Sequence, residues 1–485
     1  MNLRRLLLPL ILPAVIALGC RDEQPPPAPP PVPAFTAPEG PPPSGTGLLL
    51  IVVDTMRHDI PGRRVANRSL TPNIDRLAAG STQFSSYYAA APWTAPAFGT
   101  MFTGVSPSRH EGGLIAPREN PTAGRMVKGF YLKSIRSDMP TLAEHMKQQG
   151  MTTGAVVSNP FLFPLLGYRR GFDEFDYSIA HRRADEVTER AIRWLNANGD
   201  KPFFYLVHYI DLHTPYDPLP AHRDIFDRPA GRMQRPFMMP FDEVMRTDFT
   251  NEERSFIRSL YDGEMAQVDR QIGRLLAALQ RNGMADRTWV VLTSDHGEEF
   301  LEHGGLYHGR QYEDEVTRIP LMIRAPGGTW GAGNTIPATV CQVDLLPTLV
   351  ALAGAPPKDV EGRSLLPLLT GASDAGGRCY MEAPMMRHHP DPRLSRHLHR
   401  HAFFDGRYKV IRSDDGTIYR AFDLLRDPGE KVRLPAMYPA VRKATAAMNR
   451  YRAMLRRTGP STPSVDAVPL PADVQQSLEA LGYTQ

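Results

Sequence analysis

One run of residues sets the architecture of this 485-residue chain: Leu48-Leu49-Leu50-Ile51-Val52-Val53-Asp54. Six apolar residues without a polar interruption are typical of a strand that is covered on both faces, as in a parallel sheet. Asp54 stands at the carboxyl end of the run, which is the end where open parallel sheets bind their ligands. The run therefore predicts a central strand that ends at a functional carboxylate.

Four similar apolar runs follow, at 153–157, 203–208, 289–293 and 320–324. Helical patterns separate them, including 140–149 and the long 251–282. Strands that alternate with helices in this way form a mostly parallel sheet with helices on its faces. We therefore expect one large α/β domain over residues 47–377.

A different pattern begins at residue 378. Strand patterns at 402–404, 408–411 and 417–424 predict a small antiparallel sheet, whose first two strands are joined by the turn Asp405-Gly406-Arg407. A helical pattern at 439–457 is expected to pack on this sheet. Residues 378–458 are thus predicted to form a C-terminal subdomain, and 459–485 a tail.

Composition and charge exclude several classes of protein. The hydrophobic fraction of 42% and the charged fraction of 22% are those of a soluble globular protein, which excludes a disordered chain and a polytopic membrane protein. A net charge of +4 over this length leaves no concentrated basic stripe. No nucleic-acid partner is expected.

The N-terminus predicts export. Residues 1–19 carry Arg4 and Arg5 before an apolar run that is too short and too proline-broken to span a membrane, as in a secretory signal. The stretch Ala17-Leu18-Gly19-Cys20 resembles a bacterial lipobox, which implies a lipid anchor on Cys20. An ordinary signal with an incidental cysteine is the alternative. The proline-rich segment 20–46 predicts an extended spacer, so we expect a lipid-anchored protein of a bacterial cell envelope, facing the periplasm or the surface.

The other two cysteines, Cys341 and Cys379, leave two possibilities open. In an exported protein they can form a disulfide, and they can equally remain two buried thiols.

Polar residues with the chemistry of a metal site lie at predicted strand ends and at a helix start. Asp54 ends the first strand, Asp295 and His296 follow the strand at 289–293, and Thr94 opens the segment 93–100. Carboxylate, imidazole and hydroxyl groups suit a divalent cation such as Ca²⁺, Mn²⁺, Zn²⁺ or Mg²⁺. The structural alternative is that Asp54 and Thr94 only cap helices.

Further motifs resemble those of the sulfatase family in the alkaline phosphatase superfamily. They follow the family's order between residues 47 and 457: Asp54-Thr55-Met56-Arg57, Thr71-Pro72-Asn73, Phe102-Thr103-Gly104, Gly171-Phe172-Asp173, Asp211-Leu212-His213-Thr214-Pro215-Tyr216, Ser294-Asp295-His296-Gly297-Glu298, Arg318-Ile319-Pro320 and Asp427-Pro428-Gly429-Glu430. The resemblance implies an alkaline phosphatase-like α/β sandwich with a small antiparallel C-terminal subdomain.

The resemblance also implies roles for individual residues. Asp54, Asp295 and His296 match metal ligands, and Thr94 matches the nucleophile, which is itself bound to the metal. Three histidines match residues that bind the oxygens of the transferred group or protonate the leaving group: His213, His303 and His308. Arg57 and Arg310 are candidate substrate-binding residues, although an arginine at such a position is often only a solvated surface residue. One metal ion is expected.

Thr94 departs from the family pattern. Sulfatases of the usual kind carry Cys or Ser at this position, followed by x-Pro-x-Arg, and convert it to formylglycine. Threonine would give a ketone instead of the aldehyde, and Phe98 replaces the signature arginine. Branches of the superfamily that resemble this pattern use an unmodified threonine bound to metal, among them lipoteichoic-acid synthases, phosphoethanolamine transferases and nucleotide phosphodiesterases.

The leading functional hypothesis is a metal-dependent hydrolase of sulfate or phosphate esters, acting on an anionic ester of a glycan or lipid. A transferase that moves a phospho-group between envelope glycans or lipids is the first alternative. A catalytically silent glycan-binding homologue is the second. A His- and Arg-rich stretch between His388 and His401 is interpreted as a solvated loop at the mouth of the site.

Overall fold

The computed structural model describes residues 35–113, 131–178, 183–222, 231–354, 357, 359–373, 375–387, 396–416, 419–458 and 468–469, and part of 471–477. Cys20, the predicted signal and the first part of the predicted spacer lie outside these residues. The described residues fall within one compact unit, Val32–Gln485.

Strand β1 (Gly47–Val53) occupies the centre of the large sheet, as its sequence predicts. It pairs in parallel with β8 (Phe203–Tyr209) on one side and β9 (Thr288–Thr293) on the other. All seven β1 residues are buried, because helices cover both faces of the sheet. The other strands run outward in the order β9, β12 (Arg318–Arg324), β4 (Thr82–Tyr88) and β13 (Thr335–Ile336), and β8, β6 (Thr152–Val156) and β7 (Glu174–Asp176).

The sheet is mostly parallel. The exception is β12, which runs antiparallel to both β4 and β9. A further short strand, β14 (Val340–Cys341), pairs in parallel with β4. The predicted fold class, a large mostly parallel sheet with helices on both faces, is confirmed.

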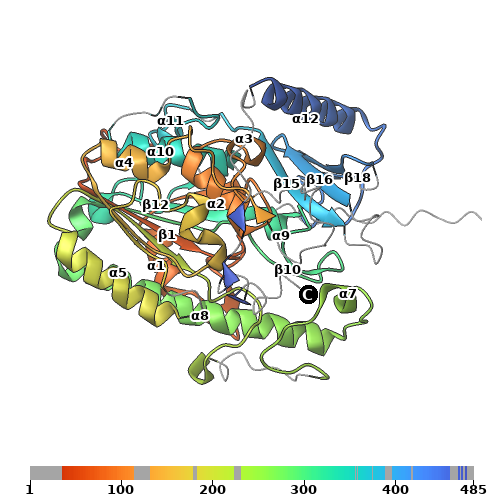
Figure 1. Ribbon diagram of the computed structural model, residues 1–485, viewed down its shortest axis with the longest axis horizontal. Coiled ribbons are helices and arrows are strands. Elements are labelled where there is room, and N and C mark those ends of the chain that lie inside the picture. The colour runs from red at the N-terminus through yellow and green to blue at the C-terminus, as the bar shows by residue number, and fades with distance from the viewer. Residues whose placement is uncertain are drawn as a thin grey trace, which may run out of the picture. The chain divides into compact units, whose positions relative to one another are not determined.

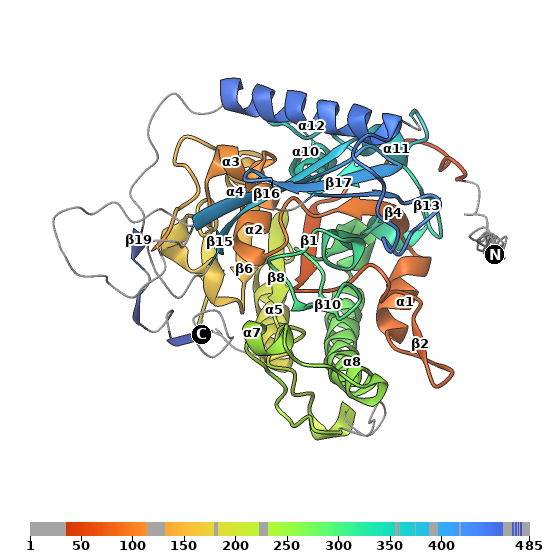
Figure 2. The ribbon, with the colours of Figure 1, turned by 90° about the vertical axis from the view of Figure 1, so that its right-hand side faces the viewer.

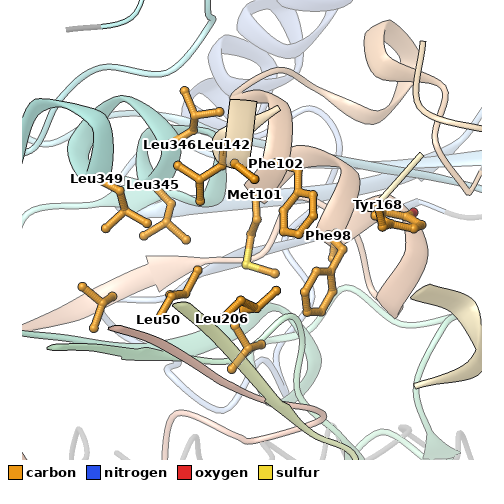
Figure 3. Close-up of a cluster of buried hydrophobic side chains, with 14 of the residues drawn as sticks. Leu50, Phe98, Met101, Phe102, Leu142, Tyr168, Leu206, Leu345, Leu346 and Leu349 are labelled. Atoms are coloured by element: carbon orange, nitrogen blue, oxygen red, sulfur yellow. The ribbon is translucent and has the colours of Figure 1, made fainter. Parts of the chain in front are cut away.

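Alternate residues of β1 face two separate hydrophobic cores, as the two-residue repeat of a strand requires. Leu48, Leu50 and Val52 pack with the helices of one face, α2 (Thr94–Thr103), α4 (Leu142–Gln148) and α10 (Leu345–Leu352), and Figure 3 shows Leu50 beside labelled side chains of these helices. Leu49, Ile51 and Val53 pack with those of the other: α1 (Pro72–Ala79), α5 (Ala184–Asn198) and α8 (Asn251–Arg281). Figure 1 shows these two helical layers on either side of the sheet.

Local sequence signals explain where helices begin. Both α4 and α8 begin with a capping box, in which the side chain of Thr141 or Thr250 accepts a hydrogen bond from the backbone of Glu144 or Glu253. The cap at Thr141 places the start of α4 at 142 instead of the predicted 140, and the helix ends at 148 instead of 149. Among the described helices, none combines the length and the apolar character that crossing a membrane requires.

A second, antiparallel sheet follows in the order β15 (Cys379–Arg387), β16 (Arg396–Phe404), β17 (Tyr408–Ser413) and β18 (Tyr419–Asp423). Helix α12 (Pro439–Thr458) packs on one face through Val441, Ala444 and Met448 (Figure 2). The other face packs on the large domain through residues such as Tyr88 and Tyr312.

The interpretation of the His-rich stretch as a loop is wrong for the residues that the structure describes. Residues 396–404 form β16, and His401 is buried between Tyr380 and Asp414, with hydrogen bonds of 2.7 and 3.1 Å. The first part of the strand was hidden in the sequence because the successive residues His399, Arg400 and His401 are all polar and show no alternation. His388 and His389 lie outside the described residues.

Cys341 and Cys379 form a disulfide, with their Cα atoms 5.5 Å apart. The bond connects β14 of the large sheet to β15 of the small sheet. Of the two possibilities that the sequence left open, the structure therefore contains the paired one.

Further short elements include β2 (Arg64–Val65), β3 (Arg68–Ser69), α3 (Pro107–His110), β5 (Tyr131–Leu132), the 3-10 turn η1 (Pro160–Leu162), α7 (Phe241–Val244), β10 (Glu299–Phe300), β11 (Leu306–Tyr307), α9 (Asp314–Thr317), α11 (Leu366–Leu369) and β19 (Val468–Pro469).

Candidate active site

Two buried carboxylates meet at the carboxyl edge of the large sheet. Asp54 follows β1 and Asp295 follows the adjacent parallel strand β9, so both side chains reach the same edge. Backbone bonds fix them: the N–H of Asp54 donates to the carbonyl of Tyr209 at 2.8 Å, and the N–H of Thr55 donates to Oδ1 of Asp295 at 3.3 Å. Both carboxylates are fully buried.

Thr94 is the first residue of α2, and the start of this helix lies against the carboxylates. Its hydroxyl oxygen is 3.3 Å from Nε2 of His296 and is completely buried. The positive end of a helix dipole favours negative charge at this position. Phe98, which replaces the signature arginine, packs one turn further on against the ring of His208, with ring centres 5.2 Å apart.

His296 directs an unprotonated nitrogen at this site. Its Nδ1 lies 3.0 Å from the carbonyl of Gly297, which can only accept, so the ring proton is on Nδ1. The Nε2 lone pair then faces Oδ1 of Asp54 at 3.8 Å and Oδ2 of Asp295 at 3.4 Å. Neither of these two oxygens has a hydrogen-bond partner in the described part of the chain, whereas the other oxygen of each carboxylate has one.

Burial makes this arrangement costly without a cation. It raises the pKa of Asp54 to about 7 and that of Asp295 to about 6, and it lowers the pKa of His296 to about 4. Two carboxylate oxygens and an imidazole lone pair that converge in a buried space fit a divalent cation, which would offset these costs. The donor set suits Ca²⁺, Mn²⁺, Zn²⁺ or Mg²⁺ and does not distinguish among them.

His208 was missed by sequence reasoning, although a histidine inside the apolar run of β8 is a signal. Its Nε2 lies 3.4 Å from Oδ2 of Asp54, and donor atoms of His208, Asp54 and Asp295 all lie within 4.8 Å of one another. Both ring nitrogens are buried, and within the described ranges neither has a hydrogen-bond partner. His208 therefore belongs to the same buried cluster of metal-ligating groups.

Asn159 was also missed. Its side-chain NH₂ donates to Oδ2 of Asp54 at 2.6 Å and to the hydroxyl of Thr94 at 3.2 Å. Its side-chain oxygen caps η1 by accepting from the N–H of Phe161 at 2.8 Å, which fixes the orientation of the amide. The available signal was its position just after β6, at the carboxyl edge of the sheet.

Two of the three predicted histidines adjoin the cluster. The ring centre of His308 lies 4.3 Å from the ring centre of His296 and 4.8 Å from that of His213. Nδ1 of His308 is 3.0 Å from a carboxylate oxygen of Glu298, and Nδ1–H of His213 donates to the carbonyl of Thr214 at 2.8 Å. In both rings Nε2 is the nitrogen opposite these anchoring contacts.

His303 makes different contacts. Its Nδ1 is 2.5 Å from Glu315 and its Nε2 is 3.1 Å from the backbone carbonyl of Glu430. Donor atoms of Glu299, His303 and Glu315 also lie within 4.8 Å of one another. Both ring nitrogens of His303 face oxygen acceptors, so the ring is a cation that donates two hydrogen bonds, and it has no lone pair to offer a metal.

The two predicted arginines differ in their surroundings. Arg57 is paired with Asp59 at 3.0 Å and Glu302 at 2.6 Å, and it donates to the carbonyl of Glu298 at 2.8 Å. Its charge is therefore already neutralised, and its contacts are to the loop that carries His308. Arg310 stacks on Phe241, with its guanidinium carbon 3.4 Å from the ring centre.

Comparison with known proteins gives matches over most of this structure. Residues 47–355 match the Sulfatase protein family, and residues 302–452 match the family described as N-sulphoglucosamine sulphohydrolase, C-terminal. Arylsulfatase K of Rattus norvegicus is 29% identical over 292 residues, which are 52% of this chain and 49% of the relative. The multifunctional alkaline phosphatase superfamily protein PehA of Trinickia caryophylli is 26% identical over 394 residues, 66% of this chain and 76% of the relative.

This chain thus spans about half the length of the arylsulfatase K that it matches. Among solved structures, the phosphonate monoester hydrolase of Agrobacterium radiobacter has a TM-score of 0.66 at 21% identity, covering 85% of this chain and 95% of that one. The BT4656 protein, solved with its substrate D-glucosamine-2-N,6-O-disulfate, has a TM-score of 0.63 at 20% identity, with coverages of 88% and 99%. These structural likenesses establish the shared fold.

Proposed function

Because this chain belongs to the sulfatase family, we propose that it is a metal-dependent hydrolase of sulfate or phosphate esters that attacks its substrate with the unmodified hydroxyl of Thr94. One observation carries the proposal. The hydroxyl of Thr94, the free oxygens of Asp54 and Asp295 and the lone pair of His296 converge in one buried cluster. A hydroxyl at a helix start beside such a cluster is the arrangement that a metal-activated nucleophile requires.

Asp54, Thr94, Asp295 and His296 would hold one divalent cation. When bound, it would supply positive charge that lowers the pKa of the Thr94 hydroxyl and draws charge from the ester oxygens. His208, whose Nε2 lies 3.4 Å from Oδ2 of Asp54, is an additional buried group beside this set.

The residues of the chain support an in-line displacement. Asn159 holds the Thr94 oxygen and Asp54 in a fixed relation through its two N–H donors. After its proton has passed to solvent, the Thr94 oxygen forms a bond to sulfur or phosphorus while the ester bond breaks. Burial lowers the pKa of His308 to about 4, so the ring that acts as the acid must take up a proton from solvent when the anionic ester binds. The protonated ring of His308 or His213 then donates this proton through Nε2 to the departing alcohol, while Nδ1 keeps its contact to Glu298 or Thr214. Water then attacks the covalent intermediate, the bond to Thr94 breaks, and sulfate or phosphate leaves.

The unmodified threonine favours phospho-chemistry, whereas the family match favours sulfate esters. The structure adds a physical reason to expect no formylglycine here. The position of the signature arginine is filled by Phe98, which is packed among aromatic rings and offers no charge. Support for both substrate types comes from the solved neighbours, one a phosphonate monoester hydrolase and the other bound to a sulfated sugar. We propose an anionic ester of a glycan or lipid as substrate.

The test combines metal analysis, turnover and trapping. The purified full-length chain is analysed for bound metal and assayed on aryl sulfates, phosphate mono- and diesters and phosphonate monoesters. We expect one metal ion per chain and turnover that Thr94→Ala abolishes. The matched control is Thr103→Ala on the same helix, because the Thr103 hydroxyl only bonds the carbonyl of Gly99. Mass spectrometry of acid-quenched protein should place a sulfo or phospho group on the peptide that contains Thr94.

Three outcomes would contradict the proposal. Turnover that survives in Thr94→Ala would remove the nucleophile assignment. Bound metal without turnover of any ester would favour the silent glycan-binding alternative, and transfer to an added alcohol in preference to water would favour the transferase.

We also propose that the chain is lipid-anchored through Cys20 in a bacterial cell envelope. The support is the lipobox-like sequence Ala17-Leu18-Gly19-Cys20 and the proline-rich spacer behind it. Radiolabelled palmitate should be incorporated by the wild-type chain and not by Cys20→Ala. Export of an unlabelled wild-type chain would support the ordinary signal instead.

A further inference from the structure

Arg310 and Arg400 are two neighbouring cations without a carboxylate partner. The Nη1–H group of Arg400 donates a hydrogen bond to the backbone carbonyl of Arg310. Within the described parts of the chain, no carboxylate lies within ion-pair distance of either guanidinium. Other arginines around the site are each paired with a carboxylate: Arg57 with Asp59 and Glu302, Arg318 with Asp314, and Arg420 with Glu313. The Arg310–Arg400 pair therefore carries positive charge that no described carboxylate neutralises through an ion pair.

The side chain of Arg310 is held in place from one side only. Its guanidinium carbon lies 3.4 Å above the ring centre of Phe241, in α7. Stacking on an aromatic ring uses the flat face of a guanidinium and leaves the N–H donors at its edge available. No hydrogen bond to these donors comes from any residue in the described ranges.

The strand register places Arg400 on the face of β16 that packs on the large domain, which carries Arg310. Ala402 and Phe404 of β16 belong to the face of the small sheet that packs on the large domain, and alternate residues of a strand share a face. The hydroxyl of Tyr312 donates to the carbonyl of Arg400 at 3.0 Å, which fixes this part of β16 against the loop after His308. The Nε atom of Arg400 is buried and, as far as the chain is described, without a partner.

Backbone contacts place the pair beside the candidate active site. The N–H of Gly309, next to Arg310, donates to the carbonyl of Pro92 at 2.8 Å, two residues before Thr94. On the other side of Gly309, the ring of His308 lies against His296. Arg310 thus directly follows Gly309, whose hydrogen bond connects this loop to the segment just before α2.

The charge of the pair calls for an anion. Burial, and after it the charge of Arg400, lowers the pKa of Arg310 to about 10, and burial lowers the pKa of Arg400. Both remain charged at neutral pH. The charges of Glu313 and Asp415 act on Arg400 from beyond ion-pair distance, and they do not cancel the effect of burial. An oxyanion with two or more oxygens, which guanidinium donors match geometrically, would offset the repulsion between Arg310 and Arg400.

We propose that Arg310 and Arg400 form a subsite for a second anionic group of the substrate, a sulfate, phosphate or carboxylate on the same molecule as the ester that is cleaved. This inference rests on the proposed ester hydrolysis, and it narrows the class of substrate. The natural substrate then carries at least two anionic groups, and the pair selects it over a singly charged ester.

The experiment compares matched probes that differ in one anionic group: glucose 6-phosphate with glucose 1,6-bisphosphate, and glucose 6-sulfate with glucose 3,6-disulfate. The readout is the ratio of kcat/KM for the doubly and singly substituted probe. Arg310→Gln and Arg400→Gln should each lower this ratio by about tenfold, as expected for loss of a charge-assisted hydrogen bond in a half-buried setting. Lysine at either position should restore part of it. The control Arg274→Gln, which removes a paired surface arginine on α8, should leave it unchanged.

Binding to Thr94→Ala protein keeps this test separate from the test of hydrolysis. Calorimetric titration of the same probes into Thr94→Ala, with and without the arginine substitutions, gives the corresponding ratio of association constants for the doubly and the singly substituted probe. A ratio that falls in both arginine variants supports the subsite even if no probe is turned over. A ratio near one in the wild-type sequence, or an equal loss for singly and doubly substituted probes, would overturn the inference. An effect in the phosphate series identifies the second group as a phosphate, and an effect in the sulfate series identifies it as a sulfate.

Discussion

The Nε2 atom of His296 lies 3.3 Å from the hydroxyl oxygen of Thr94, although the two residues are 202 positions apart in the sequence. The contact exists because β9 ends at the same edge of the sheet at which α2 begins. Since the proton of His296 is held on Nδ1 by Gly297, a nitrogen lone pair, two carboxylate oxygens and a hydroxyl share one buried space. Much of the chemistry proposed for this chain follows from that convergence.

Removal of the metal should destabilise the protein, and neutralising one ligand should reverse the effect. In metal-free protein the ionised carboxylates of Asp54 and Asp295 lie buried close together. Burial raises the pKa of both groups, so their ionised forms destabilise the folded protein. We expect chelator to lower the Tm of the wild-type protein and added metal to restore it. Asp54→Asn should raise the Tm of chelator-treated protein at pH 8 and abolish the metal-dependent increase. Scanning calorimetry with and without chelator measures both, and a chelator-independent Tm in the wild type would contradict the metal site.

Asn159 should matter for turnover more than for folding. Its amide holds both Asp54 and the Thr94 oxygen, so Asn159→Ala leaves the nucleophile free to rotate. Loss of a charge-assisted hydrogen bond of about 1.5–3 kcal/mol predicts a kcat that is roughly 10- to 150-fold lower. Asn198→Ala is the control, because the Asn198 amide only bonds the carbonyl of Trp194 on α5. Steady-state kinetics on the preferred ester decides, and an unchanged kcat would argue against a positioning role.

The sequence predicted the edge of the sheet better than the loops around it. Asp54, Asp295 and Thr94 could be predicted because strand ends and helix starts have local signals. His303 and His308 look equivalent in sequence, but the β10–β11 hairpin, which turns at Gly304 with a φ of 88°, separates them. His303 then meets Glu315 and Glu430, and His308 meets His296. A histidine inside the apolar run of β8 marks His208 in the sequence, but its partners Phe98 and Asp54 come from other elements, so its role could not be predicted.

The His303–Glu315 pair should make stability fall as the pH rises. Burial alone would lower the pKa of His303, but the hydrogen bond and charge of Glu315 raise it to about 9. A histidine whose pKa is higher in the folded protein than in the unfolded chain stabilises the fold while it is protonated. This contribution is complete below the unfolded pKa of about 6.5, and it is lost as the pH rises through the folded pKa of about 9. The unfolding free energy of the wild type minus that of His303→Gln should therefore decrease by on the order of 2–3 kcal/mol between pH 6 and pH 10. Urea unfolding at a series of pH values tests this, and a constant difference would mean that His303 is neutral in the folded protein.

The disulfide should contribute to stability and not to chemistry. Cys341 and Cys379 close a loop with a sequence separation of 38 and connect the two sheets, and neither cysteine is one of the proposed metal ligands. Constraining a loop of this length in the unfolded chain is worth about 4 kcal/mol in the chain-entropy account, and measured losses are typically about 2–4 kcal/mol. The double variant Cys341→Ser with Cys379→Ser should lower the unfolding free energy by that amount while keeping kcat on the preferred ester within about twofold, because the substitution leaves every group around Thr94 in place. Denaturant unfolding with and without reducing agent separates the cross-link from the cysteine side chains: reductant should destabilise the wild type and leave the double variant unchanged. A wild type that is insensitive to reductant in partly denaturing urea would show that the two thiols are not paired in solution.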